Sequence, residues 1–110
     1  LADVYLMKAE ALVRAGSDNG EATRLVNVIR KRAFDAPEKL FTSVTLTDIY
    51  KERRFELAWE GHARQDMIRF GTFLEAIPGW KGVTPAKCLL FPIPRRARDA
   101  NPGLIQNPGY

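Results

Sequence analysis

The polar side chains that could do chemistry are concentrated in one segment near the middle of the chain. Glu52, Glu56 and Glu60 are spaced by four residues, so on a helix their carboxylates lie along one face. His62 and Asp66 have the same spacing, and carboxylate and imidazole groups arranged in this way can bind a metal ion. Two carboxylates that flank a glycosidic bond can also hydrolyse it.

The rest of the sequence favours a structural role for this segment. A zinc-protease motif needs two histidines around a glutamate, and His62 is the only histidine in the chain. Arginines precede and follow the carboxylates, so opposite charges can pair within and between helices. We therefore predict no metal, no cofactor and no catalytic residue. We predict instead a structural ion-pair network formed by Arg54, Glu56, Glu60, His62, Asp66 and Arg69.

The two tryptophans receive different predictions. Trp59 lies in the apolar stripe of a helical segment and is predicted to be part of the core. Trp80 lies in a loop rich in proline and glycine, at residues 77–82. An aromatic ring on a loop can stack on the apolar face of a sugar, or it can fold back over the core as a lid. Both alternatives stay open, and Trp80 is the one candidate ligand-binding residue.

Charge and cysteine content exclude several classes of function. The chain has 17 lysines and arginines and 13 acidic residues, which are mixed along the sequence without interleaved aromatic residues, so we predict no nucleic-acid partner. Cys88 is the single cysteine and cannot form an internal disulfide. It lies in an apolar run, which predicts a buried thiol, and no motif links it to His62 for catalysis. No apolar stretch approaches the roughly 20 residues that span a bilayer.

The apolar spacing predicts a mainly α fold. Two amphipathic helices, at about residues 2–15 and 21–34, are separated by a short turn that includes Gly16, which predicts an antiparallel hairpin of tetratricopeptide type. The chain starts at Leu1 with a helical pattern already present, so we expect it to be part of a longer protein.

A third long helix is predicted at about residues 46–70, with Thr45 and Asp48 as a capping box at its start. Gly61 is a candidate interruption of this helix. Residues 72–110 contain many prolines and glycines and are predicted to be irregular, with one helical turn near residues 95–101. The tripeptide Asn-Pro-Gly occurs twice near the end and predicts two turns in close succession.

Three stretches, taken together, resemble the RagB/SusD family. Residues 1–12 are similar to the opening of a late helix of that family. Residues 52–71 resemble its stretch E-R-R-x-E-L-A-F-E-G-H-R-x-x-D-L-x-R-x-G, with Trp59 in place of the usual phenylalanine. Leu-Phe-Pro-Ile-Pro at residues 90–94 and the last ten residues resemble the family's ending. The order and spacing of these stretches agree with the family over the whole chain, which is identified as the C-terminal part of a RagB/SusD-like domain.

The resemblance implies a non-catalytic subunit that binds glycans or other nutrients for a TonB-dependent uptake complex in the outer membrane of Bacteroidetes. It implies a surface-exposed lipoprotein whose lipid anchor lies outside this chain, and a SusC-like TonB-dependent transporter as partner. The oligosaccharide or peptide ligand would be bound mainly by an N-terminal part that this chain lacks. The matching motifs are structural in the family, so no binding residue is carried over from them.

Two other functions stay open at this stage. The predicted hairpin alone would also suit a generic helical-repeat module for protein interaction, although such a repeat would end in a capping helix and not in two Asn-Pro-Gly turns. A carbohydrate-active hydrolase would release reducing sugar, whereas the scaffold interpretation of Glu56 and Glu60 predicts that none is released. Substitution of either glutamate is then expected to lower thermal stability, and a loss of turnover with stability intact would contradict the scaffold interpretation.

Overall fold

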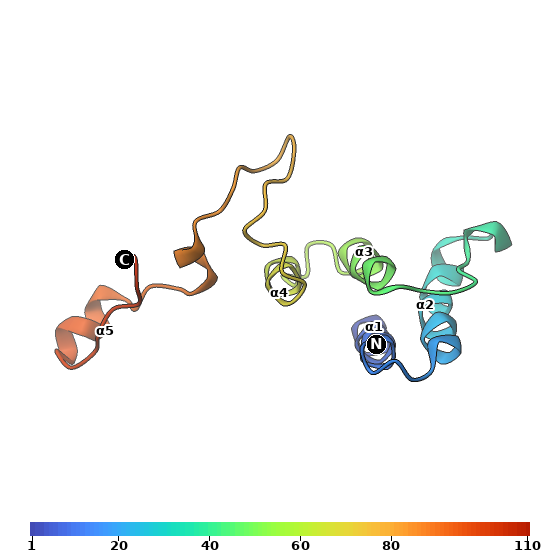
Figure 1. Cartoon of the computed structure of the whole chain (residues 1–110), viewed down its shortest axis with the longest axis horizontal. Helices are drawn as coiled ribbons and strands as arrows, with labels where there is room; N and C mark the ends of the chain where they lie inside the picture. Colours follow the sequence, from blue (N-terminus) through green and yellow to red (C-terminus); the bar gives the residue numbers. More distant parts are fainter. The chain divides into compact units, whose positions relative to one another are not determined.

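The computed structural model describes all residues from 1 to 110 and is mainly helical, as predicted, with no β-strand beyond one isolated bridge (Figure 1). It divides into two compact units, Leu1–Asp66 and Met67–Tyr110. None of the helices has the length and apolar character that crossing a membrane requires. The helices are, in chain order, α1 (Ala2–Arg14), α2 (Asn19–Ala33), η1 (Pro37–Lys39), α3 (Leu46–Glu56), α4 (Ala63–Arg69), η2 (Ala86–Leu89) and α5 (Arg95–Ala100).

In the first unit, α1 and α2 pack against each other as a hairpin. Gly16 ends the first helix in the left-handed conformation, with φ of 61°, which costs glycine little. Asp18 caps α2, because its carboxylate accepts a hydrogen bond of 2.8 Å from the backbone amide of Glu21. This cap explains why α2 begins at Asn19, two residues before the predicted start.

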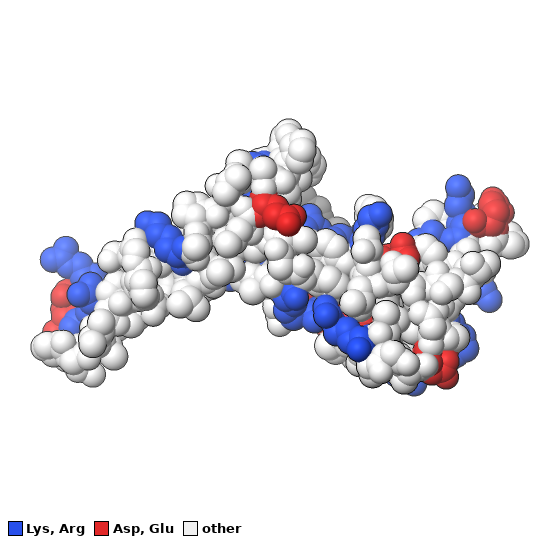
Figure 2. All heavy atoms as spheres, viewed as in Figure 1, with Lys and Arg blue, Asp and Glu red and all other residues white.

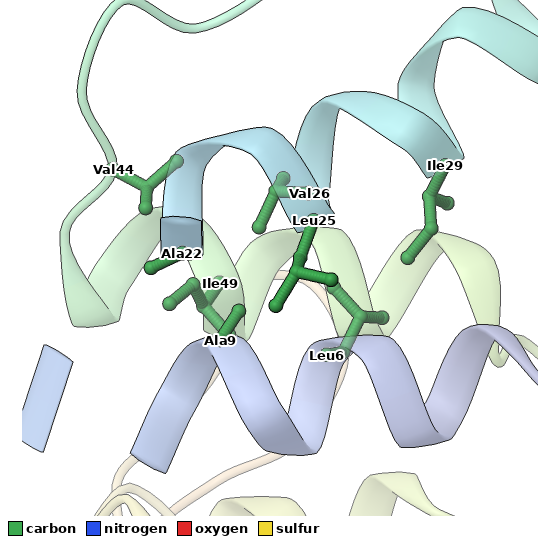
Figure 3. Close-up of a cluster of buried hydrophobic side chains, with 8 residues drawn as sticks. All are labelled: Leu6, Ala9, Ala22, Leu25, Val26, Ile29, Val44 and Ile49. Atoms are coloured by element: carbon green, nitrogen blue, oxygen red, sulfur yellow. The ribbon is translucent and has the colours of Figure 1, made fainter. Parts of the chain in front are cut away.

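The core of the first unit lies between α1, α2 and α3 (Figure 3). Its side chains follow the helical spacing in each helix, so each helix turns one apolar face inward. Val44, from the loop before α3, closes the end of the core. The buried apolar residues are Leu6 and Ala9 of α1, Ala22, Leu25, Val26 and Ile29 of α2, Val44 of the loop, and Ile49 of α3.

Polar side chains of α2 hold the connection to α3 against the hairpin. Asn27 pairs with the backbone of Phe41 in both directions, donating to its carbonyl at 2.8 Å and accepting from its amide at 2.9 Å. Asn19 donates to the carbonyl of Val44 at 2.8 Å. A side-chain amide can satisfy a backbone donor and acceptor at once, so this connection, whose one helical element is the short η1, is fixed at two points.

The predicted helix over residues 46–70 is two helices in the structure. Its start agrees with the prediction, because Thr45 and Asp48 form the capping box. Its interior differs, because α3 ends at Glu56 and α4 begins only at Ala63. Trp59 and Gly61, with φ of 68° and 80°, have a left-handed backbone that a right-handed helix cannot contain. Gly61 therefore marks the interruption that its sequence position suggested.

The same break corrects the prediction for Trp59. This residue was predicted to lie in the core as part of a continuous helical stripe, but its side chain is fully exposed. The break rotates the chain after Leu57, which is the last buried apolar residue of this segment. The apolar stripe therefore ends two residues before the tryptophan.

The second unit, Met67–Tyr110, consists mainly of turns and short helices, as predicted for this part of the chain. Its last residues are fixed by side-chain bonds to the backbone. Gln106 pairs with Ile93 in both directions, accepting from its amide at 2.8 Å and donating to its carbonyl at 3.0 Å. Asn107 donates to the carbonyl of Phe91 at 2.7 Å. Cys88 is half-buried, and so it is more accessible than the predicted core thiol.

Charged side chains do not gather in one patch on the face that Figure 2 shows. Blue lysine and arginine side chains are dispersed along the chain, with red acidic side chains between them. A surface of this kind lacks the continuous basic stripe that follows a nucleic-acid backbone.

Candidate functional site

Trp80 lies near the tip of a loop of residues 73–84, here called the Trp80 loop. The chain reverses direction at an isolated antiparallel bridge between Ile77 and Lys81. The amide of Ile77 donates to the carbonyl of Lys81 at 2.9 Å, and the amide of Lys81 donates back at 3.0 Å. Two reciprocal bonds of this length define a short hairpin.

The turn inside this bridge has the residues that its geometry requires. Pro78 fixes its own φ, and Gly79 adopts φ of 77°, a combination typical of a type II turn. The amide of Trp80 donates to the carbonyl of Ile77 at 2.9 Å and closes the turn. The backbone that carries the tryptophan is therefore specified by the sequence.

The ammonium group of Lys81 holds the two arms of the loop together. It donates to the carbonyls of Phe73 at 2.9 Å and Glu75 at 2.5 Å, and to the hydroxyl of Thr84 at 2.8 Å. It also lies 5.8 Å from the centre of the Phe73 ring. A lysine has three donors, and here each of them has an acceptor within the loop.

The indole of Trp80 is presented to solvent and is not folded back. Its side chain is 90% exposed, which excludes the lid alternative within the described chain. The ring is therefore open to solvent, and a large exposed aromatic face of this kind can stack on a sugar ring.

The second candidate is the motif segment, where a buried arginine joins two acidic residues. Arg53 is 4% exposed, and it donates to Asp66 at 2.8 Å and to Asp3 at 2.8 Å. Burial opposes the charge of Arg53, but the hydrogen bonds to Asp66 and Asp3 outweigh it and raise the pKa of the guanidinium. Arg53 therefore stays charged and links α3 to the start of α4 and to α1.

A hollow of about 350 Å³ lies beside this arginine. No group of three or more histidine, cysteine or acidic side chains is placed to hold a metal ion. The geometry suits a scaffold, because the buried carboxylate already has a charged partner. The hollow is lined by Arg53, Arg54, Leu57, Ala58, Trp59, Gly61, His62, Ala63 and Asp66.

The residues predicted to form the ion-pair network lie in different places. Asp66 is buried and bonds to Arg53, and Glu56 bonds to Arg32 of α2. Arg54 is exposed, and its guanidinium lies over the Tyr50 ring at 5.9 Å.

The other three members of the predicted network are Arg69, Glu60 and His62, and none of them is buried. Arg69 lies 5.4 Å from the centre of the Phe70 ring. Glu60 is exposed, and His62 is half-buried at the hollow. That these six residues act as one network stays a prediction.

Sequence reasoning missed Arg53 and its partner Asp3, and the helical phase could have found the arginine. Arg53 follows the core residue Ile49 by four positions, so it shares the buried face of α3, whereas Arg54 points away from it. Asp3 lies fifty positions earlier in the chain, and no local pattern indicates so distant a contact.

Comparison with known proteins connects this geometry to a family. The model of the SusD family matches residues 1–84. The starch-binding protein SusD of Bacteroides thetaiotaomicron is 36% identical over the whole of this chain, which covers 20% of that protein. The SusD-like protein P25 of Formosa agariphila is 34% identical, again over the whole chain, which covers 24% of its length.

A solved structure agrees with the fold as well as with the sequence. The crystal structure of a SusD superfamily protein from Parabacteroides distasonis superposes with a TM-score of 0.82 at 37% identity. The match covers 99% of this chain and 26% of that structure. The chain thus spans about a fifth to a quarter of the proteins that it matches.

Proposed function

Because this chain belongs to the SusD family, we propose that it is part of a non-catalytic protein that binds glycans. The observation that carries this proposal is the 36% identity, over the whole chain, to a protein named for starch binding. The buried Arg53–Asp66 pair supports a scaffold role for the motif segment, since a paired carboxylate is poorly suited to acid–base chemistry.

We further propose that the protein is a surface lipoprotein of the outer membrane. Its lipid anchor would lie outside these residues, and its partner would be a SusC-like TonB-dependent transporter that imports the captured oligosaccharide or peptide. Membership of the SusD family supports this proposal. Protease treatment of intact cells, followed by co-purification from the outer membrane, is expected to show an accessible protein associated with a large β-barrel.

Trp80 is the residue of this chain that we propose touches the glycan, with most of the ligand bound by other parts of the protein. The exposure of its side chain supports this role. The six motif residues discussed above are proposed to act as scaffold only.

Affinity electrophoresis of the full-length gene product tests the proposal. The protein is run through gels that contain amylopectin, another neutral polysaccharide, or an anionic one, and we expect at least one neutral glycan to retard it. Absence of retardation in every gel, together with tight binding to another protein, would support the alternative of a helical-repeat interaction module.

The non-catalytic part of the proposal has its own test. Incubation with the retarding glycan is expected to release no reducing sugar. Release that disappears in a Glu56→Gln variant, while the melting temperature stays unchanged, would instead indicate a hydrolase.

A further inference from the structure

None of the residues of the Trp80 loop (residues 73–84) is fully buried, so packing against a core does not fix its path. Fixing the backbone of a loop costs conformational entropy, which bonds within the loop must offset. We propose that Lys81 is a positioning residue, which holds Trp80 ready to stack on the ring of a neutral sugar. This proposal rests on the proposed function and adds to it the positioning group and the class of glycan.

The geometry places Lys81 where one side chain can control the ring. Two of its acceptors, the carbonyls of Phe73 and Glu75, precede the turn, and the third, the hydroxyl of Thr84, follows it. One ammonium group therefore ties the two arms of the loop. Trp80 is the residue directly before Lys81, so the clamp fixes the backbone that carries the indole.

The charges of the loop indicate an uncharged ligand. Residues 73–84 contain two ionisable side chains, Glu75 and Lys81. The ammonium of Lys81 is bonded within the loop, whereas Glu75 is exposed and repels anions. The exposed ring of Trp80 offers dispersion contacts to the C–H groups of a pyranose. An anionic glycan would need a free cation that this loop does not present.

The first test uses the ligand-free full-length gene product and follows the mobility of the Trp80 ring. Time-resolved fluorescence anisotropy is measured for each protein and for the same protein with Trp80→Phe. The difference between the two measurements is the signal of Trp80. In the Lys81→Met background we expect faster local motion and stronger acrylamide quenching of this signal. Thr84→Val should shift it in the same direction, and the matched Thr84→Ser, which keeps the hydroxyl, should restore the original signal.

The second test is a double-mutant cycle on the affinity for a neutral glucan that the protein binds. Trp80→Ala is expected to weaken binding roughly two- to tenfold, the range of a single aromatic contact. Lys81→Met alone should weaken it roughly two- to tenfold through the cost of ordering the loop. In the Trp80→Ala background, Lys81→Met should have no further effect, which a lysine that acts only on overall stability would not produce.

Each outcome decides the matter. Unchanged mobility of Trp80 in the Lys81→Met protein, or additive effects in the cycle, would overturn the positioning role. Binding that is unaffected by Trp80→Ala would overturn the contact proposed for Trp80, and a preference for anionic over neutral glycans would overturn the class of ligand. Either result would leave standing the proposal that the protein binds glycans. If the unmodified protein binds no glycan, the proposed function falls and this inference falls with it.

Discussion

The units Leu1–Asp66 and Met67–Tyr110 are stabilised by different kinds of interaction. Every buried residue of the chain lies in the first unit, where the interior is formed by apolar side chains and by buried polar groups that include Glu52 and the pair between Arg53 and Asp66. The second unit has no buried residue, and polar side chains bonded to the backbone fix its turns and its tail. A core buries its aromatic residues, whereas a loop fixed by polar bonds can present one. The comparison thus distinguishes the first unit, which is a scaffold, from the second unit, which carries exposed side chains on its loops.

From this comparison, we expect the largest loss of stability when the buried charge pair of the first unit is broken. Arg53→Met removes a charged partner of the buried Asp66, and breaking a buried pair in this way is expected to cost about 3–5 kcal/mol. The measurement is native-state hydrogen exchange by mass spectrometry on the full-length gene product, read as the free energy of opening for peptides within residues 1–66.

The neighbouring arginine supplies the matched control for this experiment. Arg54 has the same chemistry but is exposed on α3, so Arg54→Met is expected to change the free energy of opening by less than about 0.5 kcal/mol. Equal losses for the two variants would mean that the buried pair is not what holds α3 and α4 to α1.

A cavity in the core is the next largest perturbation. Leu6 is 0% exposed, and Leu6→Ala is expected to lower the free energy of opening of residues 1–66 by about 2–5 kcal/mol. Its neighbour Met7 is 47% exposed, so Met7→Ala serves as the control and should have a much smaller effect. Should Leu6→Ala accelerate exchange in residues 67–110 as much as in the first unit, the two units would be one cooperative body and the comparison would fail.

The parts of the fold that follow from local rules could be predicted from the sequence. Apolar spacing located the first two helices, and the capping box located the start of the third. The break after Glu56 could not be placed in the same way, because the left-handed conformation of Trp59 is unfavourable for a residue with a Cβ. The local preference of a tryptophan gives no sign of this conformation, and sequence patterns report only local preference.

The candidate site also has one part that the sequence predicts and one part that it does not. Trp80 could be identified from the sequence because Pro78 and Gly79 indicate a turn, and an aromatic residue beside a turn is easily exposed. The clamp by Lys81 could not, since its acceptors include two backbone carbonyls, Phe73 and Glu75, which no side-chain pattern reveals. Contacts from side chain to backbone become visible only once the path of the chain is known.

A smaller and strictly local effect is expected in the tail. The hydroxyl of Tyr110 lies 3.2 Å from the carbonyl of Lys87 and 2.9 Å from that of Leu90. Tyr110→Phe keeps the ring and removes this donor. The expected loss of stability is about 1 kcal/mol, the net value of a protein hydrogen bond, because the same hydroxyl bonds to water when the tail is unfolded. Exchange should accelerate around residues 87–93 and stay unchanged in residues 1–66. Tyr50→Phe, the same change in the first unit, should leave the tail unaffected.

The smallest effect concerns a surface ion pair that joins the two helices of the hairpin. Glu21 accepts from Arg24 at 2.6 Å and from Lys8 of α1 at 3.0 Å. The hydrogen bond from Arg24, followed by that from Lys8, lowers the pKa of Glu21 from 4.5 to about 2. Because the pKa is lower in the folded state than in the unfolded state, the stabilisation is complete above about pH 4.5 and is lost as the pH falls toward 2.

An NMR titration of the Glu21 carboxyl carbon gives this pKa directly, with an expected midpoint near 2 that moves toward 4.5 in Arg24→Met. The pair is exposed, so raised salt should shift the midpoint in the same direction by screening both cations. The buried pair of Arg53 and Asp66 is shielded from that screening, so the opening of residues 1–66 should depend little on salt. A strong salt dependence would mean that surface charges, and not the core with its buried pair, stabilise the first unit.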